Sequence, residues 1–132
     1  MIQEITKDRV RDNTNEDVNT EIDRVTEQNI QFYKEQSREV ILKRLQELDR
    51  EWDIERTLEL NASVIAFTGA VLSARYSKLW LSVPLIVTAF LAQHAIQGWC
   101  PPLAIFRRMN IRTRKEIDRE KYALLETLEK MQ

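Results

Sequence analysis

Cysteine and histidine each occur once in this chain of 132 residues, as Cys100 and His94, and they are its first candidates for chemistry. Gln93, Gln97 and Cys100 stand at positions i, i+4 and i+7 of a helix, and His94 lies beside them. The polar stripe Gln93, His94 and Gln97 lies inside an apolar segment. Polar groups are costly there in lipid and mark a functional site by default.

His94 has two interpretations. As a metal or haem ligand, His94 would need further ligands from other copies of the chain in an oligomer, because one His and one Cys in a chain cannot complete a coordination sphere. The interpretation that we favour is packing, in which His94 forms hydrogen bonds with Asn61 or Thr68 of the preceding apolar segment. The sequence therefore predicts no metal and no cofactor.

Cys100 is a candidate reactive thiol, and no catalytic group accompanies it. A single thiol can accept persulfide, glutathione or nitrosyl groups, or join two copies of the chain. Arg107 and Arg108 nearby would lower its pKa. The alternative is a small packing residue at the helix break that Pro101 and Pro102 impose. One cysteine excludes a disulfide within the chain.

The apolar segments that carry these residues predict a membrane hairpin. Leu79–Trp99 has 21 residues without Asp, Glu, Lys or Arg, which as a helix crosses a hydrocarbon core of about 30 Å. A shorter apolar stretch precedes it across a four-residue loop. We expect an all-α membrane protein whose hairpin occupies residues 58–106, with spans at about 58–75 and 79–99.

Small residues recur every fourth position along the first span. This spacing lets two helix backbones approach closely, either within the hairpin or between subunits. The predicted packing residues are Ala62, Ala66, Gly69, Ala70, Ser73 and Ala74.

The polar segments at both ends predict amphipathic helices. In residues 1–57 a helix should start near Glu16, with a break near Ser37 where the apolar register changes, and residues 107–132 should form another. These helices form a partner-binding seam, pack on one another, or lie on the membrane. We favour pairing of the arm with the C-terminal helix, since residues 1–60 carry a net charge of −6 and residues 107–132 of +3. The partner-binding stripes are Val18, Ile22, Val25, Phe32, Ile41, Leu45, Leu48, Trp52, Ile117, Leu124 and Leu128.

Basic residues crowd the end of the second span, where they would face lipid headgroups. Two basic residues flank the hairpin loop, so the positive-inside rule places both termini in the cytoplasm. The predicted lipid-facing charges are Arg107, Arg108, Arg112, Arg114 and Lys115.

The motif Gly98-Trp99-Cys100-Pro101-Pro102 closes the second span. With the hairpin before it, this motif resembles the YgaP-like transmembrane domain family over roughly residues 55–115. The resemblance implies a small two-helix protein of the bacterial inner membrane, in the stand-alone branch that has a helical arm and no rhodanese domain.

These features predict a non-enzymatic inner-membrane anchor, scaffold or accessory subunit. Its expected partners are membrane lipid and either further copies of itself or a larger membrane complex. The alternatives are thiol or sulfur handling through Cys100 and a small-solute or anion pathway formed by an oligomer. A rhodanese domain does not fit before residue 58. The acidic arm disfavours nucleic acid, and no small-molecule substrate is evident.

Overall fold

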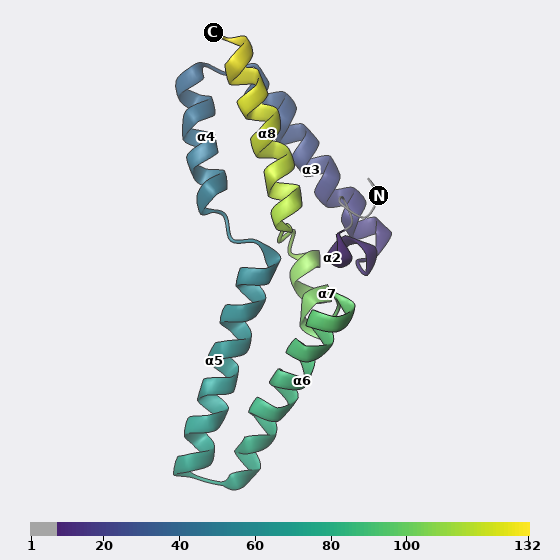
Figure 1. The fold of residues 1–132 in the computed structure, drawn as a ribbon, viewed down its shortest axis with the longest axis vertical. Coiled ribbons are helices and arrows are strands. Elements are labelled where there is room, and N and C mark those ends of the chain that lie inside the picture. The colour runs from purple at the N-terminus through teal and green to yellow at the C-terminus, as the bar shows by residue number, and fades with distance from the viewer. Residues whose placement is uncertain (1–7) are drawn as a thin grey trace.

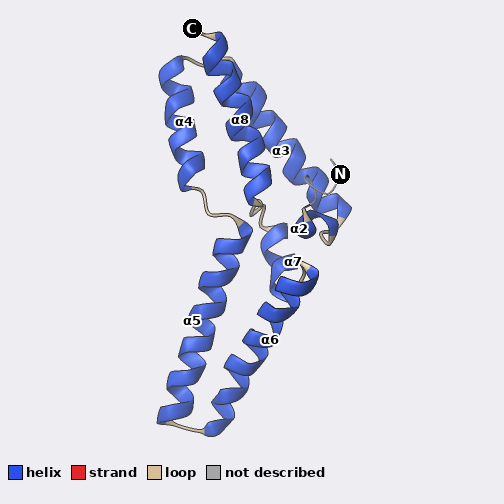
Figure 2. Cartoon of the chain, in the orientation of Figure 1, coloured by secondary structure: helices blue, strands red, loops and turns tan. Residues whose placement is uncertain are grey.

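The computed structural model describes residues 8–132, and every regular element within them is a helix (Figures 1 and 2). The all-helical prediction is therefore confirmed for this part of the chain. The elements are α2 (Arg9–Asp12), α3 (Glu16–Lys34), α4 (Arg38–Arg50), α5 (Ile54–Arg75), the short 3₁₀ turn η1 (Lys78–Leu81), α6 (Ser82–Gln97), α7 (Pro101–Arg108) and α8 (Arg114–Lys130).

Helices α5 and α6 form an antiparallel hairpin that extends away from the other helices (Figure 1). Two helical stretches are long and apolar enough to cross a membrane, one within 38–75, where α5 is the apolar part, and the other Lys78–Gln97. Only 17% and 6% of their apolar windows are buried. A core helix of a water-soluble protein would be mostly buried, so this hairpin presents its apolar side chains to its surroundings.

Half of the predicted small-residue stripe lies in the contact between α5 and α6. Ala62 and Gly69 are buried and Ala66 is half-buried, whereas Ala70 and Ala74 are exposed on the outer face. A Cβ atom on Gly69 would lie 2.8 Å from Pro84 and 2.8 Å from Val83 of α6. At Gly69 the two helices therefore approach to a distance that leaves room only for a hydrogen atom as the side chain. Ser73 is also half-buried, whereas Ala70 and Ala74 do not pack within the hairpin, because a spacing of four residues drifts around a helix of 3.6 residues per turn. Their packing against another subunit stays a prediction.

The other half of the molecule is a three-helix bundle in which α8 lies between α3 and α4 (Figure 1). Helix α3 ends at Lys34 and α4 begins at Arg38, so the chain reverses direction at residues 35–37. The arm and the C-terminal helix of one chain thus pack on each other. The main core cluster consists of Ile41, Leu45, Leu48, Ile117, Leu124 and Leu128.

This core corrects the prediction of partner-binding stripes. Ile22 of α3 and the six cluster residues are buried inside the chain's own bundle, so they present no surface to a partner. Val18 and Val25 are half-buried. Phe32 and Trp52 are exposed. Trp52 lies beyond the end of α4, where its ring stacks on Arg56.

We expect Gly69→Leu to destabilise the hairpin, because the new side chain must push Pro84 and Val83 of α6 away. Overpacking of this kind costs about 1–3 kcal/mol. Ala70→Leu is the matched control, since Ala70 is exposed one residue along the same helix. Thermal unfolding in a mild detergent, followed by circular dichroism, should show a lower midpoint for Gly69→Leu alone. Equal midpoints would contradict the close approach of the two helices.

Candidate functional site: the base of the hairpin

The hairpin joins the bundle at a junction built from five segments. These are α2, the start of α5, the end of α6, the short helix α7 and the start of α8 (Figure 1). Nearly all of the residues that the sequence identifies as candidates for chemistry lie at this junction. Buried charge, the single histidine and the single cysteine occupy three neighbouring parts of it.

Glu116 and Arg107 form the first buried ion pair. The guanidinium of Arg107 donates to both carboxylate oxygens of Glu116 at 2.7 Å, and Arg107 is only 1% exposed. Its remaining donors reach the side chains of Thr14 and Asn19 and the carbonyl oxygen of Ile111. Every N–H of this guanidinium therefore has an acceptor, which is the condition under which a buried arginine is tolerated.

Two further donors converge on Glu116. Arg11 of α2 donates at 2.7 Å and also binds Asp23 of α3. The backbone N–H of Thr113 donates at 2.8 Å, and the Thr113 hydroxyl accepts from the Glu116 N–H, which completes a capping box at the start of α8. Burial alone would raise the pKa of the Glu116 carboxyl. The hydrogen bonds from Arg107, Thr113 and Arg11 outweigh burial, and the pKa lies below its ordinary value.

A second buried carboxylate lies one turn further along α8. Glu120 is fully buried and accepts from Arg112 at 2.6 Å and from Arg44 of α4 at 2.8 Å. Arg112 also binds both carboxylate oxygens of Glu51, at 2.5 and 2.9 Å. Two consecutive turns of α8 thus hold together α2, α4 and the segments on either side of the hairpin.

This arrangement overturns part of the predicted lipid-facing charge. Arg107 and Arg112 are buried in ion pairs, 1% and 6% exposed, while Arg108, Arg114 and Lys115 remain exposed. Arg107 lies on the face of α7 that also buries Leu103. Burying such a charge is stable only beside carboxylates, which α8 supplies.

Glu116 and Glu120 were not predicted as site residues. A sequence signal for Glu120 exists, since it falls within the apolar stripe of its own helix, between Ile117 and Leu124. A charged residue on the core side of an amphipathic helix needs a buried partner.

His94 pairs with an acidic residue of α5 and not with Asn61 or Thr68. Its Nε2 atom lies 2.8 Å from Oε2 of Glu55 in the first turn of α5, while Nδ1 is buried with no hydrogen-bond partner. Glu55 was not predicted, because it precedes the apolar stretch and looks like a solvated helix residue.

The three residues of the predicted polar stripe do not line one path. His94 is buried, Gln93 is half-buried and Gln97 is exposed, and only Gln93 and Gln97 contact each other, at 3.3 Å. The predicted partner Asn61 donates instead to the carbonyl oxygen of Thr57 within its own helix. No three His, Cys, Asp or Glu residues among residues 8–132 come together as a metal site.

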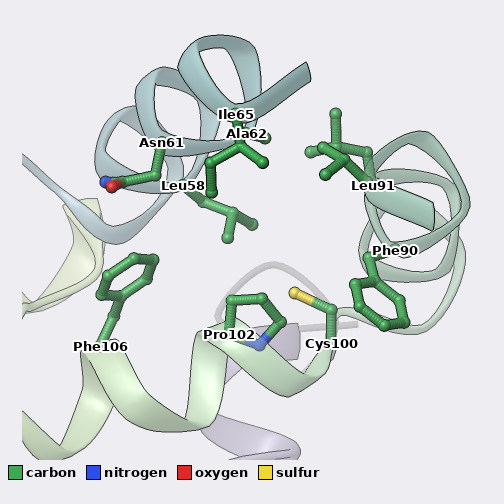
Figure 3. Close-up of a pocket in the computed structure, with 10 residues that line it drawn as sticks. Leu58, Asn61, Ala62, Ile65, Phe90, Leu91, Cys100, Pro102 and Phe106 are labelled. Carbon is green, nitrogen blue, oxygen red and sulfur yellow. The ribbon is translucent and has the colours of Figure 1, made fainter. Parts of the chain in front are cut away.

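Cys100 lies just beyond the second candidate span and borders an apolar cavity of about 110 Å³ between α5, α6 and α7 (Figure 3). The residue is 1% exposed, and burial raises the pKa of its thiol. A hydrogen bond from the Leu103 backbone lowers this pKa by less than burial raises it, and the charge of Glu55 adds a smaller increase. The expectation that Arg107 and Arg108 lower this pKa is wrong, since the pKa is raised and burial is the largest cause. Cys100 is therefore a protonated thiol at neutral pH.

The motif around Cys100 turns the chain from α6 into α7. Gly98 ends α6 with a φ of 77°, and a Cβ atom there would lie 2.6 Å from the Cβ atom of Arg9. Glycine is the residue that meets both demands. Pro101 and Pro102 then occupy the first positions of α7, where their missing N–H groups cost nothing.

No protein-family model, curated protein or solved structure matches this chain. The similarity of residues 55–115 to the YgaP-like transmembrane domain family stays a hypothesis that rests on the motif and the hairpin.

Replacing Glu116 with Gln should destabilise the folded chain by about 3–5 kcal/mol, because it leaves Arg107 buried without a counter-charge. Glu126→Gln is the matched control on the exposed side of α8, and it should change stability by less than about 0.5 kcal/mol. Chemical denaturation in detergent measures both. Similar losses for the two variants would contradict the role of the buried pair.

The lowered pKa of Glu116 also predicts a pH dependence. Its stabilising contribution is complete above the unfolded-state pKa, about 4.3, and is lost as the pH falls through the lower folded-state value. The wild-type chain should therefore lose more stability on acidification below about pH 4 than Glu116→Gln does. Parallel pH profiles would argue against this contribution.

Cys100 should react with a maleimide at least about tenfold more slowly than an exposed thiol, because it is buried and protonated. The comparison is a Ser37→Cys, Cys100→Ala double variant, since Ser37 is exposed at the α3–α4 turn. The Cys100 rate should still be rising with pH above about 8.5, the ordinary thiol pKa. Rapid labelling at neutral pH would contradict the buried thiol and favour thiol chemistry.

Proposed function

We propose that this chain is a non-enzymatic membrane anchor that presents a rigid helical bundle to partners in the cytoplasm. The observation that carries the proposal is a contrast between the two halves. The apolar side chains of α5 and α6 are largely exposed, whereas those of α3, α4 and α8 are buried in a core of their own. One half thus has the surface of a membrane hairpin, and the other that of a folded water-facing domain.

The proposed location is the bacterial inner membrane, with both termini in the cytoplasm. The low burial of α5 and α6 supports insertion, and Trp80 at the far turn would lie in the opposite interface. The excess of basic residues after α6 supports the orientation. The bacterial origin rests on the resemblance of the Gly98–Pro102 motif.

The partner surface that we propose is the end of the bundle far from the hairpin. The C-terminus and the α3–α4 turn lie together there (Figure 1). Three apolar side chains are exposed at or beside these elements: Phe32 at 58%, Val40 at 39% and Met131 at 45%. A second copy or a subunit of a larger assembly would cover them. Of the stripes predicted from sequence, Phe32 belongs to this surface, whereas the residues buried in the bundle core cannot serve as a partner surface.

The anchor role fits the junction better than the two alternatives do. Thiol handling through Cys100 would need an accessible thiolate, and burial keeps this thiol protonated. A solute pathway would need the polar stripe to face one lumen, whereas His94 points to Glu55 and Gln97 is exposed.

The test is the mass and composition of the particle extracted gently from native membranes. We expect a homo-oligomer or a larger complex, and Phe32→Ser combined with Val40→Ser should release the chain from it. Tyr122→Ser is the matched control, because Tyr122 is 65% exposed midway along α8, away from the end of the bundle. Native mass spectrometry reads the particle, and the thermal midpoint verifies that each variant folds.

A wild-type chain that is extracted alone, with no partner and no second copy, would overturn the proposal. Recovery of the chain in the soluble fraction after carbonate washing would overturn membrane anchoring itself.

A further inference from the structure

We propose that the cavity beside Cys100 is a binding site for one acyl chain of a membrane phospholipid. The inference rests on the membrane insertion proposed above and assigns a ligand to the base of the hairpin. The cavity is bounded by residues 58–65 of α5, by residues 87–91 in the middle of α6, and by Cys100 and α7 (Figure 3).

The lining of the cavity matches a hydrocarbon chain. Apart from the amide of Asn61 and the thiol of Cys100, the side chains around it are aliphatic, aromatic or proline, and they include Leu58, Ala62, Phe90 and Phe106. The sulfur atom of Cys100 points into the space that these side chains surround (Figure 3). A protonated thiol is itself a weakly polar packing group, so it does not disfavour hydrocarbon.

The size of the cavity favours part of a chain over a complete small molecule. Its volume is about 110 Å³, somewhat below the roughly 150 Å³ of an apolar cavity that holds benzene in another protein. Drug-sized ligands need pockets of about 300 Å³ or more. A few methylene groups fit, provided that the rest of the molecule continues outside.

The position of the opening identifies which molecule would continue outside. Ile65 of the lining is 50% exposed and belongs to the outer apolar surface of α5, which would face lipid. An acyl chain in the bilayer therefore meets the cavity without crossing a polar surface. Asn61 is exposed, and its Nδ2 atom donates one hydrogen to the Thr57 carbonyl oxygen. The second hydrogen and the amide oxygen are available at the rim, where a lipid ester carbonyl can accept a hydrogen bond.

A bound acyl chain also explains how the junction can be stable although it contains an apolar cavity. An empty apolar cavity forfeits contacts on its lining atoms, and lipid supplies those contacts without altering the packing of α5 against α6. The bound chain would thus complete the hairpin base on the side that the protein leaves open.

The test uses the full chain in vesicles of phosphatidylethanolamine and phosphatidylglycerol that contain a tracer phospholipid. The tracer carries a diazirine near the ester end of one acyl chain. After irradiation, mass spectrometry maps the labelled residues. We expect labelling to concentrate on the cavity residues of α5, α6 and α7, above a weaker background along the outer faces of the hairpin.

Ala62→Leu should lower the labelling of the cavity residues by about tenfold, since the larger side chain occupies the space. Val87→Leu fills the cavity from α6. It replaces Ala62→Leu as the test variant if Ala62→Leu lowers the thermal midpoint. Ala70→Leu adds the same side chain on the exposed face and should leave cavity labelling unchanged.

The outcomes separate this inference from the proposed function. Labelling that is spread evenly over α5 and α6 and is insensitive to Ala62→Leu and Val87→Leu would overturn the acyl-chain site while supporting insertion. A hairpin that acquires no label at all would overturn membrane insertion, and the acyl-chain site with it.

Discussion

Two carboxylates on successive turns of α8, Glu116 and Glu120, are the constraint on which the rest of the structure depends. Each is buried, and together they neutralise Arg107 and Arg112, which are also buried. A buried arginine without a partner would be strongly destabilising, so α7 and the loop after it are held against α8 by charge as well as by packing. Arg11 and Arg44 extend the same pairing to α2 and α4.

The pairing fixes how the hairpin is oriented relative to the bundle. Three contacts attach the chain at the entry to α5 to residues 112–114, in the loop before α8 and at its first residue: Glu51 binds Arg112, Asp53 binds Arg114, and the Ile54 N–H donates to the Arg112 carbonyl oxygen at 2.9 Å. On the other side of the hairpin, Arg9 donates to the Ala95 carbonyl oxygen at the end of α6. Both chain segments that connect the hairpin to the bundle are thereby held in place. The long axis of the bundle continues that of the hairpin (Figure 1).

The sequence predicts elements well where periodicity and caps determine them. The start of the helix at Glu16 and the Thr113 capping box follow from local rules that the structure also obeys. The sequence predicts burial poorly where one residue pattern is compatible with two different environments. A cluster such as Arg107–Arg112 after an apolar span looks the same whether its charges face lipid phosphates or buried carboxylates. Only the tertiary position of Glu116 and Glu120 distinguishes the two. The Glu55–His94 pair, which joins residues 39 apart, is equally invisible to local patterns.

In the proposed membrane anchor, the arginines at the junction would act at two stages, membrane insertion and folding. During the proposed insertion, the positive-inside rule would count the charges that follow the span, whichever partners these charges have in the folded chain. After folding, Arg107 and Arg112 no longer offer charge to lipid, because Glu116, Glu120 and Glu51 have taken it up. The orientation of the hairpin and the rigidity of the junction can therefore come from the same residues. With about 1.5 Å per residue, the 17 residues of α8 then carry the apolar end of the bundle roughly 25 Å beyond the junction. At that distance the proposed partner could contact Phe32 and Val40 without contacting lipid, so the proposed association and the proposed membrane binding would use separate surfaces.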